Sequence, residues 1–241
     1  MYLLVDAGNS RLKYGAHDGQ HWLARAACPL DLPRLDLPEG FRARRIVVAN
    51  VAGAALAGRL APHLAQAGAD IEWLRAEAGR CGVANDYADP ASLGADRWAA
   101  AIGAAPLLEK DGIVVCAGTA TTIDILRHDA TGQARFAGGC ILPGLRMMRE
   151  SLARNTAGLP LAQGRFAEPP RNTHDAIATG CLLAQTGAIA GMAATLPPGA
   201  PIVLTGGNAE MLLPHLTGDI RLQPWLVLDG LLRIATEGCA R

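Results

Sequence analysis

Two stretches of the chain, about half its length apart, share one order of apolar, small and polar residues. The first runs from Leu3 to Gln20 and the second from Val114 to Gln133. Each begins with a short apolar run, passes through an Ala-Gly turn, and returns through a second apolar run to a turn that contains glycine. Short apolar runs separated by glycine turns predict a β-hairpin in each copy.

The two Ala-Gly turns carry side chains that suit phosphate oxygens. Asn9 and Ser10 follow the first glycine, and Thr119 and Thr121 lie at the second. Glycine lets a backbone approach a ligand closely, and hydroxyl and amide groups donate hydrogen bonds to phosphate. We therefore expect the two hairpins to face each other across a cleft and to hold phosphate groups.

The rest of the chain alternates between predicted strands and helices, which indicates an α/β fold. Strands are predicted over residues 46–50, 71–74 and 202–204, and a loop over residues 81–92. Helices are predicted over residues 54–67, 94–108, 145–154 and 173–196 and after Pro224. A chain of 241 residues is near the size at which one core stops growing, so the repeat predicts two domains, residues 1–110 and 111–241.

The predicted helix over residues 173–196 has no charged face, because residues 176–209 contain no charged side chain. Its polar residues and the break at Pro197 argue against a membrane span, which needs about 20 mostly apolar residues. A helix of this kind is buried on both sides. We predict a subunit interface, where Gly187 and Gly191 permit close approach. The alternative is a central helix buried within one chain.

Composition narrows the range of partners. Lysine plus arginine equals aspartate plus glutamate at 22 each, so the chain has no basic surface for nucleic acid. The six cysteines show neither C-x-x-C nor zinc-ligand spacing, which is typical of free thiols in a reducing compartment. The first apolar run ends at Asp6 and is too short for a signal peptide. We expect a cytoplasmic protein.

Six motifs, spread in order over nearly the whole chain, resemble those of the type III pantothenate kinases. They are Asp6-Ala7-Gly8-Asn9-Ser10, Leu93-Gly94-Ala95-Asp96-Arg97-Trp98, Ala117-Gly118-Thr119-Ala120-Thr121-Thr122-Ile123-Asp124, Gly138-Gly139-Cys140-Ile141-Leu142-Pro143-Gly144, Asn172-Thr173 and Thr205-Gly206-Gly207. The resemblance implies the duplicated actin-like, ribonuclease H-like fold of acetate and sugar kinases, Hsp70 and actin. It also implies a homodimer that uses ATP to phosphorylate pantothenate to 4'-phosphopantothenate, the first step of coenzyme A biosynthesis.

The resemblance implies that Asp96 is the catalytic general base. For phosphoryl transfer, a protein must position the reactants, stabilise the charge of the transition state and supply a group that accepts the proton of the attacking hydroxyl. From its position alone Asp96 is equally suited to an N-cap or to a partner of Arg97.

The resemblance also implies a pantothenate pocket made by Tyr87, Gly94, Ala95, Asp96, Arg97 and Thr173. A guanidinium matches a carboxylate with two parallel hydrogen bonds, so Arg97 suits the acidic end of pantothenate. A surface or Asp-paired arginine is the alternative, and Tyr87 alone fits loop packing equally. Thr173 is implied to come from the neighbouring subunit, although a threonine there also suits an N-cap.

The implied ATP site combines residues from both repeats: Asp6, Ala7, Gly8, Asn9, Ser10, Arg11, Leu12, Lys13, Gly118, Thr119, Gly206 and Gly207. Asp6 would orient Mg²⁺ through water, because magnesium keeps several waters and takes few carboxylates. Lys13 alone fits a solvated strand position as well as a phosphate contact. Glycines that end strands, as Gly206 and Gly207 do, also occur in plain turns.

The chain departs from the family just before the second Ala-Gly turn. Cys116 stands where the family usually has an aspartate tied to a monovalent cation, K⁺ or NH₄⁺. A neutral thiol is a poor ligand for such cations, which prefer oxygen donors. The cation site is therefore either lost or rebuilt from backbone carbonyls. The change at Cys116 does not alter Asp96 or the residues of the phosphate turns.

Two other functions fit parts of the pattern. A different small-acid kinase of the same fold would share the phosphate turns, and a nucleotide-binding regulatory or accessory protein of the same family would share the fold without the reaction. Asp6, Asp96 and Arg97 together supply the groups that phosphoryl transfer needs, which favours the pantothenate kinase.

Overall fold

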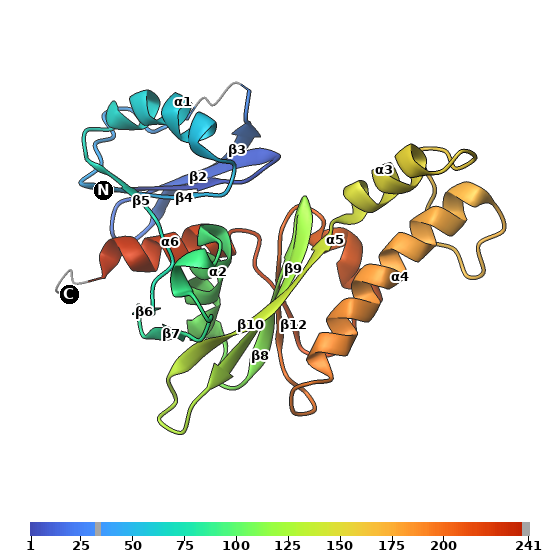
Figure 1. The fold of residues 1–241 in the computed structure, drawn as a ribbon. Coiled ribbons are helices and arrows are strands. Elements are labelled where there is room, and N and C mark those ends of the chain that lie inside the picture. The colour runs from blue at the N-terminus through green and yellow to red at the C-terminus, as the bar shows by residue number, and fades with distance from the viewer. Residues whose placement is uncertain (32–34, 238–241) are drawn as a thin grey trace. The chain divides into compact units, whose positions relative to one another are not determined.

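The computed structural model describes residues 1–31 and 35–237. They form two compact units (Figure 1). Unit 1 comprises Met1–Glu109, Arg127–Ala137 and the chain from Trp225 onward, and unit 2 comprises Lys110–Leu126 and Gly138–Pro224. The division into domains of residues 1–110 and 111–241 stays a prediction. The two units differ from these predicted domains because residues 127–137 and the last helix belong to unit 1.

Unit 1 contains a five-stranded sheet in the order β3-β2-β1-β4-β5. β1 pairs antiparallel with β2 and parallel with β4, and β5 runs parallel to β4. The strands are β1 (Tyr2–Ala7), β2 (Arg11–His17), β3 (Trp22–Pro29), β4 (Arg45–Asn50) and β5 (Ile71–Trp73). Residues 2–5 are all buried, as expected of an inner strand with apolar side chains toward both faces.

Helix α1 (Ala54–Ala65) covers this sheet through Leu56, Leu60 and Leu64, which recur every fourth residue. Two further helices of unit 1, α2 (Ala95–Ala104) and α6 (Leu226–Thr236), pack directly on each other. The predicted helix over residues 94–108 ends early, and a 3₁₀ turn, η2 (Ala105–Leu107), follows. Pro106 has no amide hydrogen to continue the α-helical ladder, and the Ile102 carbonyl instead accepts from the Arg233 guanidinium.

The second sheet repeats the strand order of the first. It has seven strands in the order β12-β11-β8-β9-β10-β7-β6, and its run β10-β9-β8-β11-β12 matches β3-β2-β1-β4-β5 position by position, with β8 antiparallel to β9 and parallel to β11. The strands of this run are β8 (Gly112–Ala117), β9 (Ala120–His128), β10 (Ala134–Pro143), β11 (Ile202–Thr205) and β12 (Ile220–Leu222). Both predicted hairpins and the duplicated actin-like fold are thereby confirmed.

The helices of unit 2 are α3 (Leu145–Asn155), α4 (Thr173–Ala193) and the short α5 (Ala209–Leu212), followed by a 3₁₀ turn, η3 (Leu213–His215). Figure 1 shows α3 and α4 side by side. By length and composition α4 is apolar enough to cross a membrane, but Ile177, Cys181 and Ile189 belong to the core of unit 2. Only 39% of its most apolar stretch is buried in the single chain, so much of this apolar helix remains exposed.

Sequence patterns missed several short elements. The predicted loop over residues 81–92 contains β7 (Val83–Asn85) and a 3₁₀ turn, η1 (Pro90–Ser92), and β6 (Gly79–Arg80) precedes it. β7 pairs with the start of β10 in unit 1. Strands of two or three residues are too short to show periodicity, and their pairing with distant segments determines them.

Candidate active site

The turn between β1 and β2 carries the first predicted nucleotide residues. Asp6 and Lys13 face each other in register across the hairpin, and Asn9 and Ser10 are exposed at its tip with Arg11 beside them. Ala7 and Leu12 are fully buried in the core of unit 1, so neither offers its side chain to a ligand. Gly8 is half-buried and starts the turn.

Asp6 lies in a charged environment inside unit 1. Burial raises the pKa of Asp6 to about 7, the Lys13 ammonium lowers it, and the Asp96 carboxylate raises it again. A buried carboxyl group near a second one is stabilised by a cation. The described residues contain no group of three or more His, Cys, Asp and Glu that could hold a metal ion. A single carboxylate such as Asp6 is chemically suited to Mg²⁺ held through water, because magnesium keeps several waters.

Asp96 lies in the first turn of α2. Gly94 holds the N-cap position, so the interpretation of Asp96 as the cap is wrong. The Asp96 Oδ1 atom accepts a hydrogen bond from the Arg97 backbone amide at 2.8 Å. Burial raises the pKa of Asp96, and this amide and the Arg97 charge oppose the increase. A half-buried carboxyl group with a raised pKa beside a second carboxyl group suits proton transfer.

Arg97 is buried, with 5% of its surface exposed, so it is not a surface arginine. Its Nη1 atom donates a hydrogen bond to the Tyr87 hydroxyl oxygen at 3.0 Å. The Tyr87 backbone amide donates to the Asn85 side-chain oxygen at 3.1 Å, which fixes the start of the loop. The structure therefore brings the predicted residue Tyr87 to the predicted residues 94–97 at the start of α2. The position of Tyr87 depends on Asn85, which sequence patterns did not single out.

A second residue that the sequence did not indicate lies beside Lys13. The Lys13 Nζ atom is 5.9 Å from the ring centre of Trp225, within the range of a cation–π contact, and the Arg25 guanidinium lies 5.7 Å from the same ring. Trp225 directly precedes α6 near the other end of the chain. No local pattern connects a single tryptophan to a strand so far away, and only the packing of α6 within unit 1 places it there.

The predicted nucleotide residues of unit 2 gather at the end of β8. Gly206 has φ +103°, and a Cβ atom there would lie 2.3 Å from the Ala117 carbonyl oxygen, so this close approach requires glycine. Asn208, which the sequence did not indicate, donates its side-chain amide to the Gly118 carbonyl at 3.0 Å. Thr119 accepts from the Gly144 amide at 2.9 Å. The Asn208 bond connects the Gly118-Thr119 turn to the segment that follows Gly206-Gly207, and the Gly144 bond connects it to the start of α3.

Cys116 lies on the same face of the sheet as the buried carboxylate of Asp124. It pairs with Thr122 across the hairpin, and Asp124 stands opposite Val114, so Cys116, Thr122 and Asp124 share one face of the sheet. Asp124 is 1% exposed and accepts a hydrogen bond from the Thr122 hydroxyl at 3.3 Å. The Cys116 thiol does not fit K⁺ or NH₄⁺, which prefer oxygen ligands.

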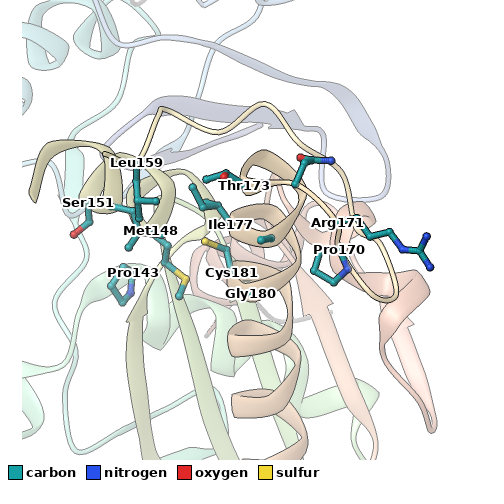
Figure 2. A pocket seen from close by; sticks show the side chains of 13 residues that line it. Pro143, Met148, Ser151, Leu159, Pro170, Arg171, Thr173, Ile177, Gly180 and Cys181 are labelled. Carbon is teal, nitrogen blue, oxygen red and sulfur yellow. The ribbon is translucent and has the colours of Figure 1, made fainter. Parts of the chain in front are cut away.

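Thr173 lies in unit 2, whereas Tyr87, Asp96 and Arg97 lie in unit 1. Asn172 caps α4 by accepting from the Asp175 amide at 2.9 Å, so the alternative of Thr173 as the cap is wrong. Thr173 is exposed and lines a groove of about 970 Å³ between α3 and α4. Figure 2 shows Thr173, Ile177 and Cys181 along α4 on one side of this groove, with Met148 and Leu159 on the other.

Comparison with known proteins places the chain among kinases. The family model described as type III pantothenate kinase matches residues 2–195. A protein named type III pantothenate kinase from Aromatoleum aromaticum is 46% identical over 245 residues, with 100% of both chains covered. A crystal structure assigned to the Baf family of transcriptional activators, from Campylobacter jejuni, has a TM-score of 0.63 at 24% identity and covers 98% of both chains.

A second solved structure supports the fold alone. The ROK hexokinase of Thermus thermophilus has a TM-score of 0.52 at 15% identity, and the match covers 98% of this chain and 99% of the hexokinase. Likenesses at these identities concern the arrangement of the strands and helices. The family follows from the sequence comparisons, which extend over the whole chain.

Proposed function

The chain belongs to the type III pantothenate kinase family, and we propose that it performs the family's phosphoryl transfer with Asp96 as general base and Asp6 as the Mg²⁺-orienting carboxylate. The reaction is the ATP-dependent phosphorylation of pantothenate, the first step of coenzyme A biosynthesis. The observation that carries this assignment is the geometry of unit 1, where Asp6 pairs with Lys13 across the β1-β2 hairpin, and Asp96 lies in the first turn of α2 next to the buried Arg97.

Asp96 accepts the proton of the pantothenate hydroxyl as that oxygen attacks the γ-phosphorus of ATP. Its raised pKa brings it closer to the working pH, which favours proton transfer in the transition state. Tyr87 and Arg97 bind the carboxylate end, and Gly94 and Ala95 present backbone beside Asp96. The phosphates lie on the backbone of residues 6–13 with Lys13, and on Gly118 and Thr119, with the nucleoside at Gly206 and Gly207. When bound, Mg²⁺ neutralises charge on the phosphates.

The direct test measures ADP release by the purified protein with pantothenate as acceptor, with acetate and a hexose as alternative acceptors. We expect ADP release that depends on pantothenate and Mg²⁺, and a much smaller rate with the other acceptors. ADP release with acetate or the hexose and none with pantothenate would contradict the proposal. Nucleotide binding without transfer to any of these acceptors would point to a regulatory protein.

We further propose that the protein is a cytoplasmic homodimer and that α4 forms its interface. Apart from His174 near its start, the exposed positions of α4 carry small residues and one large apolar residue, Leu183, which is 56% exposed. Six large apolar side chains of the described residues are prominently exposed, and five belong to unit 2: Ile141, Met147, Leu161, Leu183 and Met211. An exposed apolar helix face with Leu183 at its middle suits a protein interface. In this dimer the partner's Thr173 completes the pantothenate pocket.

The interface is tested by Leu183→Asp. A carboxylate placed in an apolar interface loses its hydration, so association should weaken at least about tenfold. Sedimentation equilibrium should give a mass of two chains for the unchanged protein and a shift toward one chain for the variant. Leu23→Asp is the matched control, because Leu23 is an exposed leucine of unit 1 at 42% exposure. A dimeric Leu183→Asp protein would contradict the proposed interface.

The cation requirement is tested at Cys116. Because the thiol does not supply an oxygen ligand, we expect kcat to change less than about twofold when K⁺ or NH₄⁺ replaces a bulky organic cation at constant ionic strength. Cys116→Asp adds a carboxylate on the face that already holds Asp124, and it should make the rate respond to K⁺. A strong response of the unchanged protein to K⁺ would show that the site is rebuilt from other oxygen atoms.

A further inference from the structure

The Arg97 guanidinium is enclosed by two aromatic rings. Its central carbon lies 5.7 Å from the ring centre of Tyr87 and 5.5 Å from that of Phe136, both within cation–π range. The two rings contact each other at 5.7 Å with an angle of 66° between their planes. Tyr87 also accepts a hydrogen bond from Arg97, whereas Phe136 offers only its ring and is completely buried.

Main-chain pairing fixes the positions of the two rings. Phe136 in β10 pairs with Asn85 in β7, and its carbonyl accepts from the Asp86 amide at 3.0 Å. The Asn85 side chain in turn accepts from the Tyr87 amide. Arg135, next to Phe136, forms an ion pair with Asp86. The strand that carries Phe136 thus also holds the loop that carries Tyr87.

Because the two rings already hold the Arg97 guanidinium, a ligand that binds it has less side-chain motion to restrict. An arginine side chain loses considerable rotamer freedom when a ligand orders it, and a guanidinium that is already held loses less. The Tyr87 oxygen accepts from Arg97, so the hydroxyl hydrogen of Tyr87 can be donated to a ligand. Arg97 and Tyr87 together form a prepared donor pair for a carboxylate.

We propose that Phe136 is a positioning residue for the recognition of pantothenate. It holds the Arg97 guanidinium against Tyr87, so that the substrate carboxylate meets donors that are already ordered. Phe136 acts through Arg97 and does not touch the substrate. This inference rests on the role of Arg97 in the proposed function.

The test is Phe136→Leu, which keeps an apolar side chain and removes the ring. We expect the KM for pantothenate to rise about tenfold, while kcat and the KM for ATP change less than about twofold. Phe41→Leu is the matched control, because Phe41 is another buried phenylalanine of unit 1 and belongs to the core around α1. Thermal unfolding is measured for both variants, and Phe136→Met replaces Phe136→Leu if the latter does not fold.

Two comparisons separate positioning from a general loss of packing. In an Arg97→Met background, Phe136→Leu should raise the KM no further, because the two residues act as one. With pantothenyl alcohol, in which CH₂OH replaces the carboxylate, Phe136→Leu should have no effect on KM.

If Arg97→Met raises the KM for pantothenate but Phe136→Leu behaves like Phe41→Leu, the inference is wrong and the proposed site stands. The same holds if Phe136→Leu raises the KM equally for the acid and the alcohol. If Arg97→Met leaves the KM unchanged, the proposed role of Arg97 is wrong and the inference fails with it.

Discussion

Asp96→Asn is expected to lower kcat for pantothenate phosphorylation by about 10²- to 10⁴-fold, the usual contribution of a general base. Asparagine has nearly the same shape and can still accept the hydrogen bond from the Arg97 amide, but it cannot accept the proton of the attacking hydroxyl. The fold and the KM for ATP should therefore change little. ADP release measured at saturating ATP and pantothenate gives kcat directly.

Asp89→Asn is the matched control, since Asp89 is an exposed aspartate of the same unit that caps the 3₁₀ turn η1, and asparagine caps equally well. The pH profile adds an independent readout. Burial raises the pKa of Asp96, so its base form is lost at a higher pH than that of an exposed aspartate, and kcat should fall as the pH is lowered through that raised value. Retention of more than a tenth of kcat in Asp96→Asn would exclude Asp96 as the base.

Gly230→Ala is expected to destabilise the protein by about 3 kcal/mol, the upper part of the range for overpacking a close contact. A Cβ atom at Gly230 in α6 would lie 1.8 Å from the Ala99 carbonyl oxygen in α2, and one at Gly103 would lie 2.5 Å from the Leu226 carbonyl oxygen. These atoms belong to the backbone and cannot rotate away, so the two helices must move apart. For a chain of this size the expected fall in Tm is about 6–12 °C.

The control for this prediction is Gly58→Ala in α1, where a Cβ atom would meet nothing within 4 Å. At such a position alanine favours the helix, and stability should rise by about 0.5–1 kcal/mol. Thermal unfolding followed by circular dichroism compares the two variants. Because α2 carries Asp96 and Arg97, the folded fraction of Gly230→Ala should also lose activity. Equal Tm values for the unchanged protein and Gly230→Ala would show that α2 and α6 are not in backbone contact.

The parts of the fold that local patterns could predict are those with a strong period or turn signal. Both hairpins, β4, α1, α3, α4 and β11 were predicted within a few residues of their observed ends. The short strands β7 and β12 were missed because three residues carry no period. β3 and β10 were missed because alanine and glycine, which occupy many of their positions, give little contrast between the two sides of a strand. The predicted helix over residues 94–108 is too long because Pro106 interrupts the backbone hydrogen bonds, although the apolar pattern continues past it.

The duplicated hairpins, the family and the chemical groups of the site can all be predicted from local motifs, because short motifs in a fixed order specify turns and side chains without reference to distant residues. Three contacts are visible only once the chain is folded: Arg97 lies between Tyr87 and Phe136, Asn208 holds the Gly118 turn, and Trp225 lies beside Lys13. The same is true of the packing of α6 in unit 1, through the contact of Gly103 and Gly230. Each of these contacts joins segments that are far apart in the chain, and packing between distant segments leaves no periodic signal in either of them.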